Sequence, residues 1–408
     1  MKALISITLE MGIAHFHTYS ASLNITVLGL RFVEDSTTRH NFSPSLGETA
    51  EMRVEVIPPP SGHYSGYTFH IGIVRELSNG TDQHIDWVNV QPEQGPGAYY
   101  NWRDVDFQSK VFTWNGIPSV PFGQSALIST GRDVFTGADG NTVNIRFPAV
   151  TAGQPVPPPF YTAVAMIKGS NNNVITETRK RIFVPQVVKM VYEADAVSLM
   201  KQGRFNTAGT TNIIQKISDP EWEEMRTSIP AGAQEFIDLI GANIRFVCDS
   251  TAVSPPYKTI RIVNRIVIGN RHYSALGITR DFSFMNESMI GTGYVGMGQL
   301  YDIFPRYSNV DNGTFALPVK PHEIRSHCIR TTLHECGHMF GLVADNNVLG
   351  GDNGKHNLNP SGGIHIMDDG TAVTYERRFR RPGHEEWRWR ELNEEYLKFI
   401  LPKEEKTP

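Results

Sequence analysis

The chain has 408 residues, of which 40% are hydrophobic and 20% are charged, and its formal net charge is −4. This length is enough for two or three ordinary domains, and the composition is that of a soluble globular protein with a sizeable core. The charge balance gives no global basic field, so it argues against nucleic acid or an anionic membrane surface as a partner. No apolar run reaches the length that a transmembrane helix needs.

The first residues resemble a secretory signal. Lys2 precedes an apolar run at residues 3–9, and small residues follow at 20–22, although Glu10, His15 and His17 interrupt the apolar region. The expectation is a secreted or extracytoplasmic protein. The low cysteine content is compatible with this location, because bacterial extracellular proteins often lack disulfides.

Three cysteines are present, at Cys248, Cys328 and Cys336. They are too few for a disulfide scaffold, and their spacing matches neither a zinc ribbon nor a redox motif. A bridge between Cys248 and Cys328 has no support beyond the presence of the two residues.

Residues 1–180 have the pattern of β structure. Runs with β-type composition recur, separated by turns rich in Gly, Pro and Asn, and no helical periodicity of any length occurs. The runs are residues 23–32, 50–57, 67–77, 142–147 and 160–169. This pattern predicts an all-β sandwich, immunoglobulin-like or similar, as an accessory domain.

Residues 181–408 alternate between strand and helix patterns, which predicts an α/β (α+β) domain. Ser218 or Asp219 is a candidate N-cap with Pro220 at a first helical position, and Gly241 is the expected end of a helix. The expected strands cover residues 179–192, 243–249, 258–269 and the glycine-rich run 288–303. Further helices are expected at about 321–342 and around Trp389, Leu392, Tyr396 and Phe399, closed by Pro402. Phe236, Leu239 and Ile240 are expected to share one helix face.

The expected helix at 321–342 contains His-Glu-Cys-Gly-His at residues 334–338. Residues four apart lie on one helix face, so His334 and His338 can offer ring nitrogens to one metal ion. Glu335 lies beside that ion, where a general base can take a proton from an activated water. Zinc suits such a site because it binds neutral imidazole and keeps an open coordination position.

The neighbouring run His322–His327 is an internal comparison. It also pairs two histidines with an acidic residue, but the spacing of five turns the two side chains apart. It therefore predicts no metal site. Cys336, inside the motif, faces away from both histidines on a helix and is expected to contribute to packing.

The run from His334 to Gly341, followed by Met367 in "HIMDDG", resembles the metzincin clan of zinc metallopeptidases. The resemblance covers roughly residues 180–408. It implies a twisted, mostly parallel sheet, an active-site helix, a sharp exit at Gly341 and a methionine turn at Met367 beneath the metal. By analogy, the glycine-rich run 288–303 would be the edge strand that pairs with substrate.

The chain departs from the clan at the third ligand. The usual position, three residues after the glycine, holds Ala344, and Asp345 comes one residue later. A long polar, glycine-rich loop follows and offers His356. Imidazole is the preferred third zinc ligand where two imidazoles are already present, so His356 is the favoured ligand. Asp345 is the second choice. His365 is expected to be a neighbour in the methionine turn rather than a ligand.

Calcium is a further metal ion that the chain could bind. Residues 345–354 and 310–314 carry suitable oxygen atoms, but neither has the spacing of a known calcium loop, so polar turns are the favoured interpretation.

The leading hypothesis is a zinc metalloendopeptidase that cleaves protein or peptide substrates, with His334, His338 and His356 on one zinc ion and Glu335 as the general base. One alternative is a β-rich binding or adhesion protein whose zinc domain is inactive. A second is a gluzincin-type peptidase, in which a downstream glutamate among residues 385–395 completes the site. Tyr375 could reach the cleft and stabilise an oxyanion, but nothing in its spacing shows this, so it is not assigned to the site.

Overall fold

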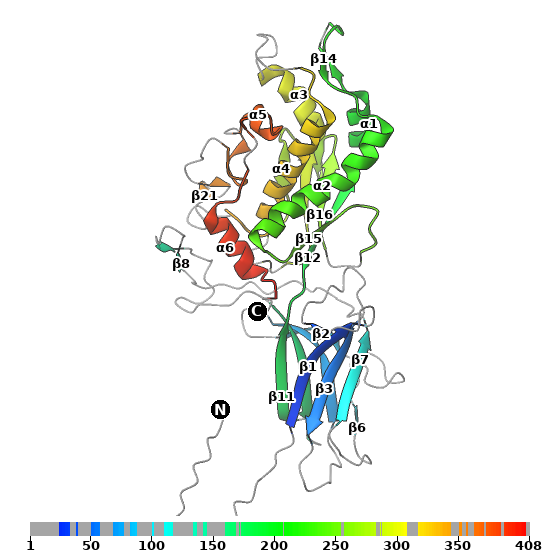
Figure 1. Ribbon diagram of the computed structural model, residues 1–408, viewed down its shortest axis with the longest axis vertical. Coiled ribbons are helices and arrows are strands. Elements are labelled where there is room, and N and C mark those ends of the chain that lie inside the picture. The colour runs from blue at the N-terminus through cyan, green and yellow to red at the C-terminus, as the bar shows by residue number, and fades with distance from the viewer. Residues whose placement is uncertain are drawn as a thin grey trace, which may run out of the picture.

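The computed structural model describes the backbone of the strands between residues 24 and 168 and most of residues 171–404. Gaps fall at 172, 207, 254–256, 283–285, 287, 308–316, 344–350, 353–355, 358–362, 371–372 and 385–386. Taken as a whole, the chain is a mixed α/β structure with several sheets (Figure 1). None of the helices in these ranges combines the length and apolar character needed to cross a bilayer.

The first half of the chain forms antiparallel sheets, as its pattern predicts. One sheet has the order β2-β1-β3-β7 and another the order β11-β10-β4-β5, with β6 paired to β4. The strands are β1 (Asn24–Phe32), β2 (Thr38–Arg39), β3 (Ala50–Ile57), β4 (Thr68–Glu76), β5 (Asp82–Trp87), β6 (Tyr100–Asn101), β7 (Lys110–Gly116), β8 (Val134–Thr136), β9 (Thr142–Asn144), β10 (Phe160–Lys168) and β11 (Val174–Ile182). The strands β8 and β9 form a separate hairpin. An immunoglobulin-type sandwich stays a prediction.

The chain changes sheet between β11 and β12 (Gln186–Tyr192). The sequence predicts one strand over 179–192, but Pro185 lies in the gap that separates these two strands. Proline has no N–H to donate to a ladder, which explains the interruption. The division into domains at 180 and 181 stays a prediction.

The second half is built on a five-stranded sheet of order β15-β12-β16-β20-β19. All its pairs are parallel except β19 with β20. Its strands are β15 (Ile244–Val247), β16 (Lys258–Val263), β19 (Gly277–Thr279) and β20 (Gly291–Gly296), together with β12. The mostly parallel sheet implied by the sequence is therefore present, but its antiparallel edge strand is β19.

The prediction that the glycine-rich run 288–303 forms one edge strand is wrong in two respects. The strand β20 covers only Gly291–Gly296 and lies between β16 and β19. The helix α3 (Met297–Tyr307) then takes the rest of the run, since its apolar side chains recur at helical spacing and bury Leu300, Tyr301 and Phe304.

The remaining elements are helices and short hairpins. The helices are α1 (Ala194–Gln202), α2 (Asp219–Ile240), α4 (Pro321–Met339), α5 (Tyr375–Arg378) and α6 (Glu391–Ile400). The hairpins pair β13 (Arg204–Phe205) with β14 (Asn212–Ile214), β17 (Ile266–Ile268) with β18 (Arg271–Tyr273), and β21 (Gly351–Asp352) with β22 (His356–Asn357).

The helix α2 begins and ends where the sequence predicts. Ser218 is its N-cap, with its hydroxyl accepting from the backbone N–H of Glu221, and Gly241 ends it in the left-handed conformation. Its apolar face is different from the expected one. Ala233, Ile237 and Ile240 are buried, whereas Leu239 is 83% exposed.

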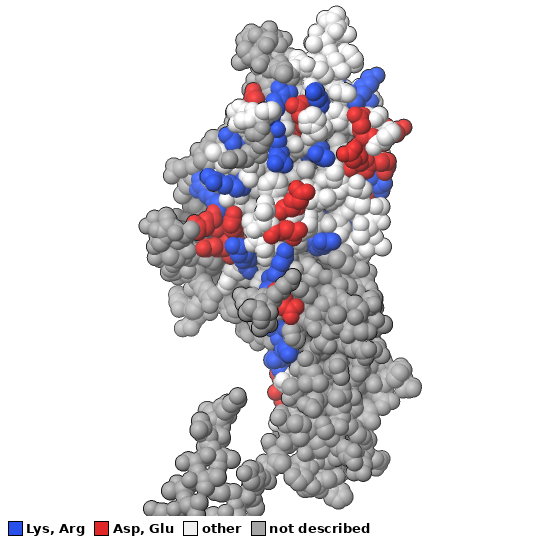
Figure 2. All heavy atoms as spheres, viewed as in Figure 1, with Lys and Arg blue, Asp and Glu red and all other residues white. Residues whose placement is uncertain are grey.

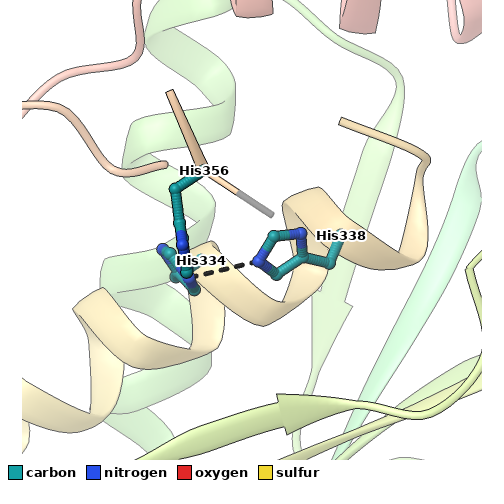
Figure 3. A group of neighbouring side chains, drawn as sticks. All are labelled: His334, His338 and His356. Carbon is teal, nitrogen blue, oxygen red and sulfur yellow. Dashed lines mark hydrogen bonds between the residues drawn. The ribbon is translucent and has the colours of Figure 1, made fainter. Parts of the chain in front are cut away.

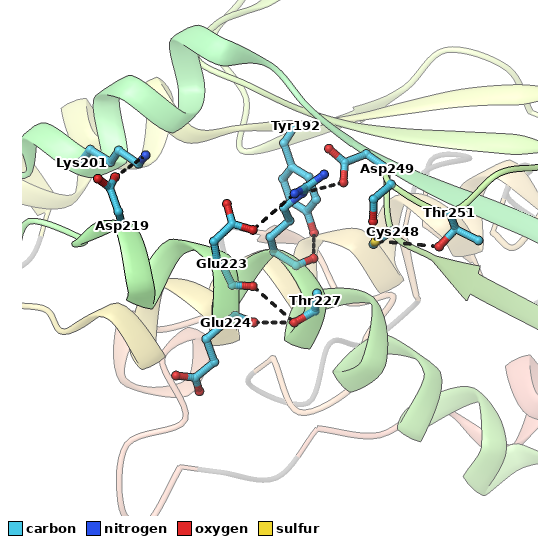
Figure 4. A network of polar contacts seen from close by, with 11 residues as sticks. Tyr192, Lys201, Asp219, Glu223, Glu224, Thr227, Cys248, Asp249 and Thr251 are labelled. Carbon is cyan, nitrogen blue, oxygen red and sulfur yellow. Dashed lines mark hydrogen bonds and ion pairs between the residues drawn. The ribbon is translucent and has the colours of Figure 1, made fainter.

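The helix α2 packs against α4 and β15, and α4 lies against β20 and β19. Polar contacts fasten the side of α2 to the ends of β12 and β15 (Figure 4). The Tyr192 hydroxyl donates to the carbonyl oxygen of Arg226, and the Arg226 guanidinium donates to Asp249 at 2.8 Å. These contacts fix α2, and through it the helix α4, on the sheet.

Positive and negative side chains are interspersed over the α/β part of the face shown in Figure 2.

The helix α6 begins at Glu391, so Trp389 precedes it rather than sharing its face. Tyr396 is fully buried as part of the core.

Candidate metal centre

The helix α4 carries the His-Glu-Cys-Gly-His motif in its last two turns, and nearly all of this part of the helix is buried. His334 and His338 lie on one face, and their Nε2 atoms are 3.2 Å apart (Figure 3). His334 Nδ1 lies 2.6 Å from the carbonyl oxygen of Ile366, which can only accept a hydrogen bond. The proton of a neutral His334 ring is therefore on Nδ1, and its Nε2 presents a lone pair toward His338.

His356 on β22 joins these two rings. Its ring centroid lies 5.3 Å from that of His334 and 5.7 Å from that of His338. In each of the three histidines one ring nitrogen lies within 4.8 Å of those of the other two. We call His334, His338 and His356 the histidine cluster.

Asp369 holds the other side of the His356 ring, with Oδ2 3.3 Å from Nδ1. A carboxylate on Nδ1 orients an imidazole and leaves its Nε2 for a metal ion. Next to His356, Asn357 fastens β22 to the following turn. Its backbone N–H donates to the carbonyl oxygen of Met367, and its side-chain amide donates to Asp368 Oδ1 at 3.0 Å.

Two of the cluster's nitrogen atoms have the spacing that a zinc ion requires. Two nitrogen ligands about 2.05 Å from a tetrahedral zinc ion lie about 3.3 Å apart, close to the 3.2 Å between the Nε2 atoms of His334 and His338. Zinc also needs neutral imidazoles. Burial, with the neighbouring histidines, holds the pKa of His334 well below its usual value and lowers that of His338 to about 3. Whether the cluster binds zinc stays a prediction.

Glu335 is buried beside the cluster and faces the edge of the sheet. The Thr279 hydroxyl on β19 lies 2.9 Å from Glu335 Oε2, to which it can donate. Burial raises the pKa of Glu335 to about 8. A β-carbon added to Gly277 would lie 2.2 Å from Glu335 Oε1, so only glycine lets the edge strand pass this close to the carboxyl group.

A tight turn after His356 packs beneath the helix. The guanidinium of Arg330, on α4, donates to the carbonyl oxygens of Gly363, His365 and Ile366 and so holds this turn in place. Met367 is fully buried, and a β-carbon on Gly337 would lie 2.4 Å from its sulfur. The small residue in the motif therefore makes room for the methionine that the sequence singled out.

The chain leaves α4 where the sequence predicts. The helix ends at Met339, and Gly341 takes the left-handed conformation with φ of +88°. Glycine adopts this conformation without the strain that other residues incur.

A pocket of about 550 Å³ opens beside the cluster. We call it the cluster pocket. Its walls include His334, Glu335 and His356, together with residues of α5 and the preceding turn, among them Asp369, Tyr375 and Arg378. Glu335 and two of the three cluster histidines therefore line the same cavity.

The other sequence candidates are either outside the described residues or outside the cluster. Ala344 and Asp345 are outside the described residues, as are residues 310–314 and much of 345–354, which offered oxygen ligands for calcium. His365 lies in the methionine turn, as expected, with Nδ1 3.9 Å from Asp368 Oδ2. His327 is fully buried and is not part of the cluster.

The cysteines form no disulfide: Cys248, Cys328 and Cys336 are all free. Cys336 is 1% exposed and belongs to the hydrophobic core, which confirms its expected role in packing.

Sequence reasoning missed the residues that support the cluster. Thr279, Arg330 and Arg378 belong to no motif, and each is brought to the site only by the fold. Asp369 lies in the methionine-turn run, but its contact with His356 was not foreseen. Arg330 gives the one usable signal, because it shares a helix face with His334 and His338, one turn and two turns away.

No protein-family model matches the chain, and no curated protein matches it significantly. Among solved structures, the chain is similar to the major pilin subunit of Bacillus cereus, with 10% identity over 42% of this chain and 44% of that chain and a TM-score of 0.18. It is also similar to the sporulation control protein of Bacillus subtilis, with 9% identity over 40% and 48% of the two chains and a TM-score of 0.15. The chain thus spans less than half the length of either protein, and TM-scores this low carry no argument about function.

Proposed function

We propose that the protein is a zinc-dependent metalloendopeptidase. The observation that carries the proposal is the convergence of three imidazoles from two separate elements, two of which line one pocket together with a buried glutamate. Three protein ligands with an open position are what hydrolytic zinc sites need, and buried acids with a raised pKa are typical of general bases.

The residues at the cluster and around it divide the chemistry among them. His334, His338 and His356 would hold the zinc ion, which would polarise the peptide carbonyl and lower the pKa of a water molecule. Glu335 accepts the proton of the attacking water and passes it to the leaving amine. The hydrogen bond from Thr279 keeps the Glu335 carboxyl group in one orientation.

Several features support membership of the metzincin clan. Gly341 turns the chain out of α4, Met367 packs beneath the motif, and an antiparallel edge strand passes over Glu335. The departure from the clan lies in the longer path to His356. We propose that residues 181–408 form the zincin-type catalytic domain. An immunoglobulin-like sandwich before it would bind a partner or substrate outside the cytoplasm.

Replacement of Glu335 by Gln tests the mechanism. The change keeps the shape of the side chain but removes the base, so peptide hydrolysis should fall by roughly 10²- to 10⁴-fold while zinc remains bound. Hydrolysis of quenched-fluorescent peptides and zinc content by elemental analysis measure the two effects. Hydrolysis at the wild-type rate would rule out Glu335 as the base.

The same assay separates the competing hypotheses. A β-rich binding or adhesion protein with an inactive zinc domain would cleave no peptide, with or without a chelator. For the gluzincin-type alternative, Glu385 and Glu386 lie outside the described residues, and the described glutamates on α6 are not part of the cluster. No observation favours that alternative over His356.

A further inference from the structure

The cluster pocket contains a buried cation that the proposed chemistry does not use. Arg378, on α5, is only 5% exposed and is among the residues that line the pocket. Its Nη2 donates to the carbonyl oxygen of Gly370. Among the described residues this is the one hydrogen bond that its guanidinium makes.

Arg378 forms no ion pair within the part of the chain that the structure describes. Burial of a guanidinium without an anion is unfavourable, and accordingly burial lowers the pKa of Arg378 to about 10. The guanidinium stays charged at neutral pH even so. A planar cation of this kind, facing a cavity, is suited to a carboxylate, which can accept two parallel hydrogen bonds from it.

The two aspartates of the pocket are engaged elsewhere. Asp368 accepts from the Asn357 amide through Oδ1 and from the backbone N–H of His365 through Oδ2. Asp369 lies against His356 Nδ1. Asp369 is near enough to act on the pKa of Arg378, but neither aspartate lies within ion-pair distance of its guanidinium. A direct ion partner is therefore left to a bound molecule.

We propose that Arg378 binds a carboxylate of the substrate, so that the enzyme prefers peptides with a carboxylate close to the bond that is cut. The inference rests on the proposed peptidase function, because the same pocket contains Glu335 and His334. The carboxylate can belong to an aspartate or glutamate side chain or to the carboxyl terminus of a short peptide.

Matched peptides distinguish these sources. One set places Glu, Gln or Lys at each position flanking the scissile bond in a blocked peptide, and a second set compares a free with an amidated carboxyl terminus. The wild type should cleave the best Glu peptide with kcat/KM roughly 10- to 100-fold above its Gln counterpart. A preference for the free terminus alone would assign the carboxylate to the chain end.

Variants of Arg378 connect the preference to this residue. Arg378→Gln should bring the Glu and Gln peptides to similar kcat/KM, and Arg378→Lys should restore part of the difference because it keeps the charge. Arg380→Gln is the matched control, since Arg380 is exposed and does not line the pocket. Circular dichroism and zinc content show that each variant is folded and loaded.

Binding gives a readout independent of turnover. Calorimetric titration of Glu335→Gln with the Glu and Gln peptides should show tighter binding of the Glu peptide, and this difference should vanish in Glu335→Gln/Arg378→Gln. Cleavage without any preference for a carboxylate would overturn the inference and leave the peptidase proposal standing. If no peptide is cut, the peptidase proposal fails, and equal binding of the two peptides would then overturn the inference as well.

Discussion

At the scale of single residues, burial sets the protonation state of the site. His334 and His338 are neutral at physiological pH because desolvation penalises their charged forms, so protons compete little with a metal ion. Burial raises the pKa of Glu335 instead, because the neutral form that burial favours is here the protonated acid. A nearby divalent cation would favour the carboxylate, which a general base needs.

The metal-free protein should show the Glu335 effect in its stability. The folded-state pKa of about 8 exceeds the ordinary value of 4.5, so the stability contributed by the protonated form is complete below about pH 4.5. It is lost as the pH rises toward 8. The free energy of unfolding of chelator-treated wild type should therefore fall relative to Glu335→Gln over this window, as measured by urea denaturation. Parallel curves for the two proteins would contradict the raised pKa.

At the scale of elements, the sequence predicted what local patterns control and missed what packing decides. The capping residue Ser218, the stop at Gly241 and the exit at Gly341 depend on local backbone chemistry, and all three are confirmed. The exposed Leu239 was wrongly assigned to the core, because the face of α2 is set by where α4 and β15 lie. The place of β19 at the edge of the sheet could not be predicted either, because it depends on how strands far apart in the sequence pair.

The candidate site divides in the same way. Two histidines and a glutamate at helical spacing are visible as a motif. Ligand chemistry, together with the freedom of the glycine-rich loop, favours His356 over Asp345, and the structure brings His356 to the other two histidines. Thr279 and Arg378 could not be predicted, since each meets the site only after strands and helices far apart in the chain have assembled.

The contact between Gly337 and Met367 links the helix to the turn. Met367→Ala should lower the free energy of unfolding by about 2–5 kcal/mol because it leaves a buried cavity. Gly337→Ala should also destabilise, since its β-carbon would meet the methionine sulfur. In the double variant the new methyl group occupies part of the cavity, so the loss should be smaller than the sum, by roughly 0.5–3 kcal/mol.

A second pair serves as the control for this cycle. Met225 on α2 is also buried, but it is not among the atoms closest to Gly337. Gly337→Ala and Met225→Ala should therefore add within about 0.5 kcal/mol. If the losses of unfolding free energy from Gly337→Ala and Met367→Ala were additive, the two residues would not be in direct packing contact.

At the scale of the whole molecule, the two halves of the chain are built on separate sheets, joined where β11 passes into β12. If the halves are independent domains, calorimetry of the intact chain should resolve two unfolding transitions. A chelator should lower the midpoint of one alone, because a bound metal stabilises only the part that holds it. His356→Ala should remove this chelator effect. One transition that shifts as a unit would contradict the division.

The central claim is that the histidine cluster is a zinc site completed by His356, and the zinc content of the purified protein tests it most directly. The wild type, Asp345→Ala and His365→Ala should each retain about one zinc ion per chain, whereas His356→Ala should lose it. Loss of zinc in Asp345→Ala with full retention in His356→Ala would contradict the assignment, and absence of zinc-binding capacity from the wild type would contradict the claim as a whole.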